Sequence, residues 1–167
     1  MVLHIFLVQL NINGCIKMSI QLSPLQLVQM VFTKTRVEIL DDADGLGESL
    51  ATQFDFEGVN LLVENTVGQQ ESNTTDFLVA LRVAVLNEAD AVKKAPYTFD
   101  IAVQGVFKLA ADFTCDDRYD LVRVNGSAML YGAIRDMLQQ ITARSMLGTL
   151  LLPTLHFLPE SAESKNA

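Results

Sequence analysis

The sequence predicts an α+β domain in which three or four antiparallel strands are followed by one helix that covers one face of their sheet. Two patterns favour this class: apolar residues alternate with other residues over several early segments, and apolar residues at helical spacing come after them. The length of 167 residues suits a single domain. Half of the residues are hydrophobic and 19% are charged, which excludes a disordered polar chain, a collagen and a coiled coil.

The first strand is predicted over residues 27–40, which are rich in Val, Ile, Phe and Thr and partly alternate. Residues 41–47, rich in Asp and Gly, predict a turn. A calcium loop with Gly45 as its central glycine would need Glu at its twelfth position, where Ala51 stands, so that site is rejected. Residues 54–64 are expected to form an irregular crossover with at most one short strand.

Further along the chain, residues 68–75 are polar and predict a loop. Clean alternation over 76–87 predicts a strand, and the same alternation from Tyr97 to Val103 predicts its hairpin partner. Gly105 interrupts the next apolar run, so a bulge or a sharp bend is expected there.

A helix is predicted over residues 127–144, with Asn125 or Ser127 as its N-cap. Its apolar stripe consists of Leu130, Ile134, Met137, Leu138 and Ile141. Its opposite side holds Arg135, Asp136, Gln139, Gln140 and Thr142, and Met129, Tyr131 and Ala133 lie outside the stripe. Residues 150–152 form a short apolar segment that ends at Pro153. Apolar residues outside the stripe, and on both faces of the 76–87 strand, indicate oligomerisation or a binding groove.

The charge of the chain disfavours nucleic acid as a partner, because the net charge is −8. Residues 38–81 contain ten carboxylates and no Lys or Arg, which indicates either a solvated surface or a docking patch for a basic partner. Two cysteines are too few for a disulfide framework, which suggests a reducing compartment and a cytoplasmic protein.

Three parts of the chain are expected. Residues 1–17 are interpreted as an upstream extension or a mis-assigned start, with Met18 as a plausible first residue. The apolar run in residues 2–10 is too short to cross a bilayer, so no stable membrane insertion is expected. Residues 18–158 form the single domain, and residues 159–167 form a disordered polar tail.

No catalytic residue can be nominated, because no nucleophile elbow, phosphate loop or dinucleotide fingerprint is present in the sequence. The polar cluster within 112–120 is expected to be a turn between strand and helix. Its thiol, Cys115, precedes two aspartates, which disfavour the thiolate. His156 has no neighbouring His or Cys with which to bind a metal. The protein is therefore expected not to be an enzyme and to use no metal and no cofactor.

A collinear set of residues resembles the bacterial SecB export-chaperone family over residues 22–157. The set comprises Phe32-Thr33-Lys34, Leu81-Arg82-Val83, Gln104-Gly105-Val106-Phe107, Leu130-Tyr131, Arg135-Asp136, Arg144, Leu150, Leu152 and Phe157. The resemblance implies a four-stranded antiparallel sheet with one long helix packed on one face. It also implies an ATP-independent holdase, assembled as a homotetramer (a dimer of dimers), that binds unfolded precursor proteins and delivers them to the SecA motor.

The resemblance also nominates binding residues. In the family, the crossover and the chain after the helix line the client groove, and here these segments supply apolar residues that a small core cannot all use. The client-binding residues expected on this ground are Phe54, Phe56, Leu61, Val63, Leu150, Leu152 and Phe157. The acidic residues expected to dock the motor are Glu38 and Asp100. Another acidic position of the family's first strand falls near Thr35 and is lost in this chain.

Two departures from the family keep other functions open. Gly126-Ser127 stands where the family usually has Cys-Pro, and only ten residues follow Phe157, where the family usually has a second helix. The alternative is a SecB-like chaperone dedicated to another client, such as an antitoxin of a toxin-antitoxin system. A third hypothesis is an α+β domain that encloses a small molecule between sheet and helix.

Overall fold

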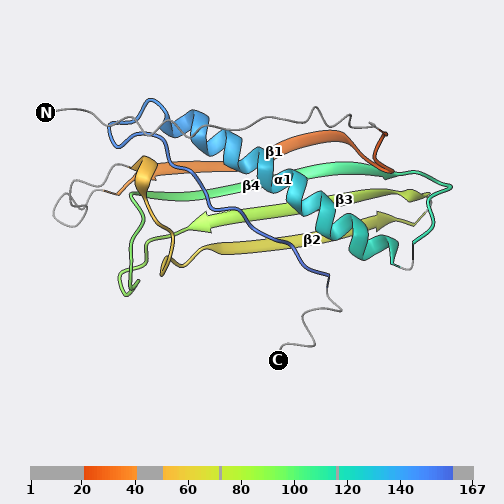
Figure 1. Ribbon diagram of the computed structural model, residues 1–167, viewed down its shortest axis with the longest axis horizontal. Helices are drawn as coiled ribbons and strands as arrows, with labels where there is room; N and C mark the ends of the chain where they lie inside the picture. The colour runs from red at the N-terminus through yellow and green to blue at the C-terminus, as the bar shows by residue number, and fades with distance from the viewer. Residues whose placement is uncertain (1–20, 41–50, 72, 116, 160–167) are drawn as a thin grey trace, which may run out of the picture.

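One antiparallel sheet and one long helix make up the fold of the computed structural model, which describes residues 21–40, 51–71, 73–115 and 117–159 (Figure 1). The strands are β1 (Leu25–Ile39), β2 (Leu62–Gln70), β3 (Asn73–Val85) and β4 (Tyr97–Leu109), in the spatial order β1-β4-β3-β2. The helix α1 (Arg118–Thr142) crosses one face of the sheet diagonally. The predicted fold class is confirmed.

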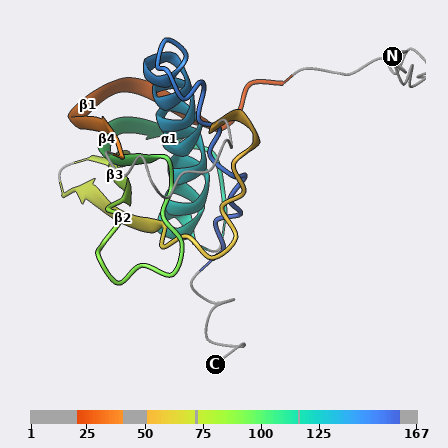
Figure 2. The same cartoon turned by 90° about the vertical axis from the view of Figure 1, so that its left-hand side faces the viewer.

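The core lies between the sheet and α1, and Figure 2 shows both in profile with the helix on one side only. The strands β3 and β4 contribute alternate side chains to it, as their period-two pattern predicts. The fully buried large residues of the two strands are Phe77, Leu81, Tyr97, Phe99, Ile101, Phe107 and Leu109. The intervening side chains face away from the helix, on a face of the sheet that no other described element covers.

The helix begins at Arg118, so the predicted start near residue 127 is wrong. Its N-cap is Asp117, whose carboxylate accepts a hydrogen bond of 2.8 Å from the Asp120 N–H. Asn125 and Ser127, the two predicted N-caps, lie inside the helix, where Ser127 and its neighbour Gly126 are buried. A Cβ on Gly126 would lie 3.0 Å from Cγ2 of Val79, so the small residue here allows close packing on the sheet.

The predicted stripe is correct at Leu130, Ile134 and Leu138, which are buried. It is wrong at Ile141, which is 40% exposed, and it omits Tyr131, which is only 4% exposed. Tyr131 is buried because the chain after the helix returns along α1, where the Tyr131 hydroxyl donates a 2.6 Å hydrogen bond to the carbonyl of Pro153. The helix is therefore covered on a second side as well.

The polar loop predicted over residues 68–75 is a tight hairpin between β2 and β3. Asn73 stabilises its strand end, because its Oδ1 accepts hydrogen bonds from the N–H and the hydroxyl of Thr75. Polar side chains are tolerated here, since these strand ends are largely open to solvent. The strand β2 shares only residues 62–64 with the predicted crossover and continues to Gln70, so the strand here is longer and begins later than predicted.

The break predicted at Gly105 is absent, because β4 runs unbroken from Tyr97 to Leu109. A Cβ at position 105 would lie 2.8 Å from Cε2 of Phe107 and 2.9 Å from Cδ2 of Leu130, so the glycine makes room for the helix. The register shifts of this pair of strands lie in β1 instead, at Val28 and at Thr33.

Several predictions concern residues outside the described part of the chain. They are the extension over residues 1–17, the turn over residues 41–47 and almost all of the tail over residues 159–167. Within the described residues, α1 is the one helix of any length, and it is not apolar enough to cross a membrane.

Candidate functional site

An open groove of about 510 Å³ lies beside α1, between the crossover segment (residues 54–61) and the post-helix segment (residues 149–158). Figure 2 shows both segments on the same side of the sheet as the helix. The groove is lined by Phe54, Asp55, Phe56, Glu57, Leu61, Arg135, Leu151, Leu152, Pro153 and Thr154. Both walls are irregular chain that packs against the core on its inner side.

The crossover wall is held in place by Lys93. Its ammonium group donates hydrogen bonds to the carbonyls of Asp55 (2.6 Å) and Glu57 (3.0 Å) and lies 5.1 Å from the ring centroid of Phe54. The rings of Phe54 and Phe56 meet edge to face at 5.2 Å. Gly58 turns the chain with a φ of 81°, a conformation that favours glycine. The aromatic side chains therefore sit on a fixed turn.

The post-helix wall is held mainly by side chains. Within the described part of the chain, no backbone–backbone hydrogen bond is made by residues 149–158. Thr142 Oγ1 accepts a 2.9 Å hydrogen bond from the Leu150 N–H, and Arg123 donates one to the Leu158 carbonyl. The hydroxyl of Tyr131 holds Pro153, and burial raises the pKa of Tyr131 to about 12, so this donor keeps its proton at neutral pH. The backbone of this wall is extended and has few partners.

The structure places four of the seven expected client-binding residues in the lining of the groove, namely Phe54, Phe56, Leu61 and Leu152, and of these Leu152 is only 1% exposed. The other three lie elsewhere. Val63 packs against the core from β2, Leu150 is fully buried, and Phe157 meets the ring of Tyr131 edge to face at 6.0 Å.

Two lining residues were not among the expected ones. Leu151 is 51% exposed in the groove, and the sequence holds no signal that separates it from the identical leucines on either side. Arg135 was assigned to the solvent side of the helix. Sequence periodicity could not show that another segment borders that side.

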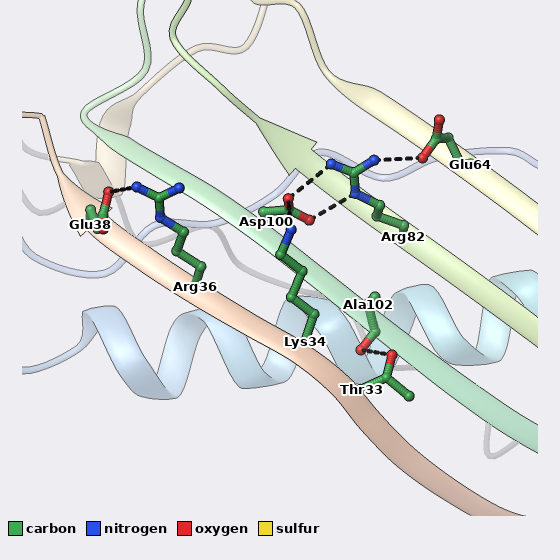
Figure 3. Close-up of polar contacts among 8 residues, drawn as sticks. All are labelled: Thr33, Lys34, Arg36, Glu38, Glu64, Arg82, Asp100 and Ala102. Carbon is green, nitrogen blue, oxygen red and sulfur yellow. Dashed lines mark hydrogen bonds and ion pairs between the residues drawn. The ribbon is translucent and has the colours of Figure 1, made fainter.

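The two acidic residues expected to dock a motor lie on the uncovered face of the sheet, where basic side chains neutralise both (Figure 3). Asp100 is only 5% exposed, because Arg82 and Lys34 cover it. Arg82 also pairs with Glu64 at 2.9 Å, and Glu38 pairs with Arg36 at 2.8 Å. This ionic cluster is defined as Lys34, Arg36, Glu38, Glu64, Arg82 and Asp100. With three positive and three negative members, it is not a negative patch.

The ion pairs shift the pKa of Asp100 to about 2, chiefly because Arg82 hydrogen-bonds its charged form. The pKa of Arg82 is raised by the same bonds and by Glu64. Asp100 is therefore fully ionised at neutral pH and fully paired.

Metal chemistry has no visible site in the described residues, which contain no group of three or more His, Cys, Asp or Glu side chains arranged to hold an ion. The grooves found on the described residues, of about 530, 510 and 880 Å³, are all open to solvent. The site that remains is an elongated, partly apolar groove bordered by two chain segments, which is typical of a polypeptide-binding protein.

Comparison with solved structures finds the same fold in a SecB-like chaperone. The chain is similar to the SecB-like chaperone of Mycobacterium tuberculosis, solved in complex with a ChAD peptide from the HigA1 antitoxin, with a TM-score of 0.52 and 18% identity over 78% of this chain and 87% of that one. A Streptococcus agalactiae protein of unknown function has a TM-score of 0.47 and 8% identity over 77% of this chain and 96% of that one. No protein-family profile and no curated protein matches the sequence. The fold implied by the sequence resemblance is confirmed.

Proposed function

We propose that the protein is an ATP-independent chaperone that holds unfolded polypeptides in the groove between its crossover and post-helix segments. The observation that carries this proposal is the groove itself, whose walls expose aromatic and aliphatic side chains beside a loosely bonded, extended backbone. Apolar contact with an extended chain requires no particular sequence, and it selects unfolded states, because folded proteins bury the same groups.

A dedicated client, such as an antitoxin, is the function that the observations favour over delivery to SecA. The M. tuberculosis protein of the same fold was solved with an antitoxin peptide, which supports a client of this kind here. Delivery to SecA is the second candidate. The neutralised state of Glu38 and Asp100 weakens it, since a paired carboxylate attracts a basic partner less strongly.

Assembly as a homotetramer in the cytoplasm completes the proposal. Apolar side chains remain exposed on α1 and on β1, among them Met129 (44%) and Val28 (64%). Exposed apolar residues of this kind are typical of surfaces that oligomerisation buries.

Two titrations test the function. The first measures aggregation of a chemically unfolded protein by light scattering, without nucleotide, and suppression is expected at low and high salt. Suppression that requires ATP, or equal binding of folded protein, would overturn the holdase mechanism. The second measures binding to SecA and to an antitoxin encoded beside the protein.

Binding to the antitoxin without binding to SecA is expected. The opposite result would establish the export role: the wild-type protein binds SecA, and the double variant Glu38→Lys with Asp100→Lys loses that binding but still suppresses aggregation.

A further inference from the structure

The groove contains one side chain whose bonding is incomplete. Arg135 lies on α1 and lines the groove beside Pro153 and Thr154. Its Nε is buried and has no hydrogen-bond partner in the part of the chain that the structure describes. No ion pair within the described residues involves its guanidinium, in contrast to Arg82 and Arg123. A buried donor without a partner costs free energy, and because the Nε is itself closed to solvent, a ligand in the groove would supply its acceptor to the rest of this guanidinium.

The other charged residues that line the groove come from the crossover segment and not from α1. Asp55 and Glu57 are exposed on the crossover segment. Asp55 accepts a hydrogen bond from the Glu57 N–H, and its carboxylate lies 3.6 Å from the ammonium of Lys93. The groove thus carries carboxylates from the crossover segment and a guanidinium from α1.

We infer that Arg135 is a specificity residue of the groove, which binds an Asp or Glu side chain of an extended apolar client segment. This inference rests on the proposed function and adds a chemical preference to it. A guanidinium presents a planar fork of donors that matches a carboxylate, and charge-assisted bonds of this kind are the strong ones. The apolar walls take the neighbouring residues of the client, and the client carboxylate turns toward α1, away from Asp55 and Glu57.

Two labelled peptides test the inference by fluorescence anisotropy with the full chain. Both have an acetylated N-terminus, an amidated C-terminus and alternating Leu and Ser residues; one has Asp at its centre and the other has Asn. The wild-type protein is expected to bind the Asp peptide about tenfold more tightly at low salt, which corresponds to about 1.4 kcal/mol. The preference is expected to shrink at high salt, because salt screens a partly exposed ion pair.

Variants then assign the preference to one residue. Arg135→Met should abolish it while leaving the affinity for the Asn peptide within twofold, and Arg135→Lys should retain part of it. The matched control is Arg144→Met, which removes the same charge from an exposed position just beyond the end of α1 and outside the groove. It should leave the preference intact.

The other outcomes overturn the inference in distinguishable ways. If the wild-type protein binds neither peptide, the proposed function of the groove is wrong, and the inference falls with it. If it binds both equally, or if Arg135→Met weakens both equally, the groove binds chains but Arg135 does not select them. If Arg135→Met changes the sedimentation coefficient of the assembly, the guanidinium belongs to a contact with a second copy of the chain.

Discussion

Arg82 donates two hydrogen bonds to Asp100, from Nε and from Nη2, and both are 2.9 Å long. The pair joins β3 to β4 on the uncovered face of the sheet, where Ala84 and Ala102 are the register partners of Asp100 and Arg82. Lys34 contacts the same carboxylate from β1 at 2.5 Å. One carboxylate therefore connects three of the four strands.

This connection predicts a pH-dependent contribution to stability. The pKa of Asp100 is about 2 in the folded protein and near 4 in the unfolded chain, so its contribution is complete above about pH 4 and is lost as the pH falls toward 2. Asp100→Asn should lower the free energy of unfolding by about 2 kcal/mol at pH 7. Urea denaturation at pH 7 and at pH 3 should show a smaller difference between variant and wild type at pH 3.

The control for this prediction is Glu38→Gln, which removes a carboxylate that is half exposed in its ion pair with Arg36. Exposed pairs contribute little, so a change within about 0.5 kcal/mol is expected at both pH values. An equal loss for Asp100→Asn at both pH values would show that the ionised pair is not the source of its stability.

The close approach of α1 to the sheet predicts that Gly105→Ala is destabilising. The added Cβ would lie within 3 Å of the side chains of Phe107 and Leu130. Overpacking of this kind costs about 1–3 kcal/mol. Gly132→Ala is the matched control, because nothing lies within 4 Å of a Cβ at that helical position, and it should stabilise the protein by up to about 1 kcal/mol. Thermal unfolding that shows no difference between the two variants would contradict the packing argument.

The alternation within the post-helix wall predicts a separation of binding from stability. Leu151→Ser should weaken the binding of an unfolded client with little change in melting temperature, because Leu151 is half exposed in the groove. Leu150→Ala should instead cost about 2–5 kcal/mol of stability, since Leu150 is fully buried. Anisotropy and thermal melts on the same samples measure both effects. Unfolding of the Leu151→Ser variant would place that residue in the core.

The anchoring of the post-helix segment predicts that Tyr131→Phe loosens it. The variant removes the hydroxyl that donates to the Pro153 carbonyl while keeping the ring that contacts Phe157. A cost of about 1 kcal/mol is expected, as for one intramolecular hydrogen bond. Hydrogen exchange should rise locally in residues 150–158 and not in β3. A uniform rise across the protein would mean that the segment does not open independently.

The surplus apolar surface predicts self-association. Sedimentation at micromolar concentration should give the mass of four 18.4 kDa chains. Met129→Glu should reduce that mass without changing the circular dichroism spectrum, because this side chain is exposed on α1. A wild-type monomer at this concentration would contradict both the tetramer and the chaperone proposal.

Local patterns predicted the central strands well and the helix start poorly, for physical reasons. The alternation of apolar residues in β3 and β4 follows from burial of one face of the sheet, and this period of two is directly visible in the sequence. The helix start was placed near residue 127 because Asn125 and Ser127 are good N-caps, and the close approach of Gly126 to Val79, which is distant in sequence, is invisible to a local pattern. The hairpin at Asn73 was missed because polar residues carry no periodic signal.

The candidate site was predictable by its segments rather than by its individual residues. The crossover and the post-helix chain both border the groove, but which leucine of residues 150–152 faces it depends on how the turn at Gly148 directs the chain. Arg135 could not be assigned, because its surroundings come from a segment that returns along the helix only in the folded protein.

The two register shifts of β1 determine which deletions in this strand keep its side chains on the same face of the sheet. The residues of β1 that pair with core-facing residues of β4, and so lie on the helix side of the sheet, are Leu25, Leu27, Met30, Phe32, Thr35, Val37 and Ile39. The extra residues Val28 and Thr33 each reverse the parity of the strand, so its middle is out of phase with both ends, which remain in phase with each other. Val28 and Thr33 are themselves the unpaired extra residues, so deleting either one would restore regular pairing there and leave every other side chain of β1 on its present face. Deleting one residue from a regularly paired stretch would instead reverse the faces of the side chains on one side of the cut. Loss of a single residue is thus tolerated at either bulge, and relatives of this fold are expected to differ in β1 length by single residues at these two positions.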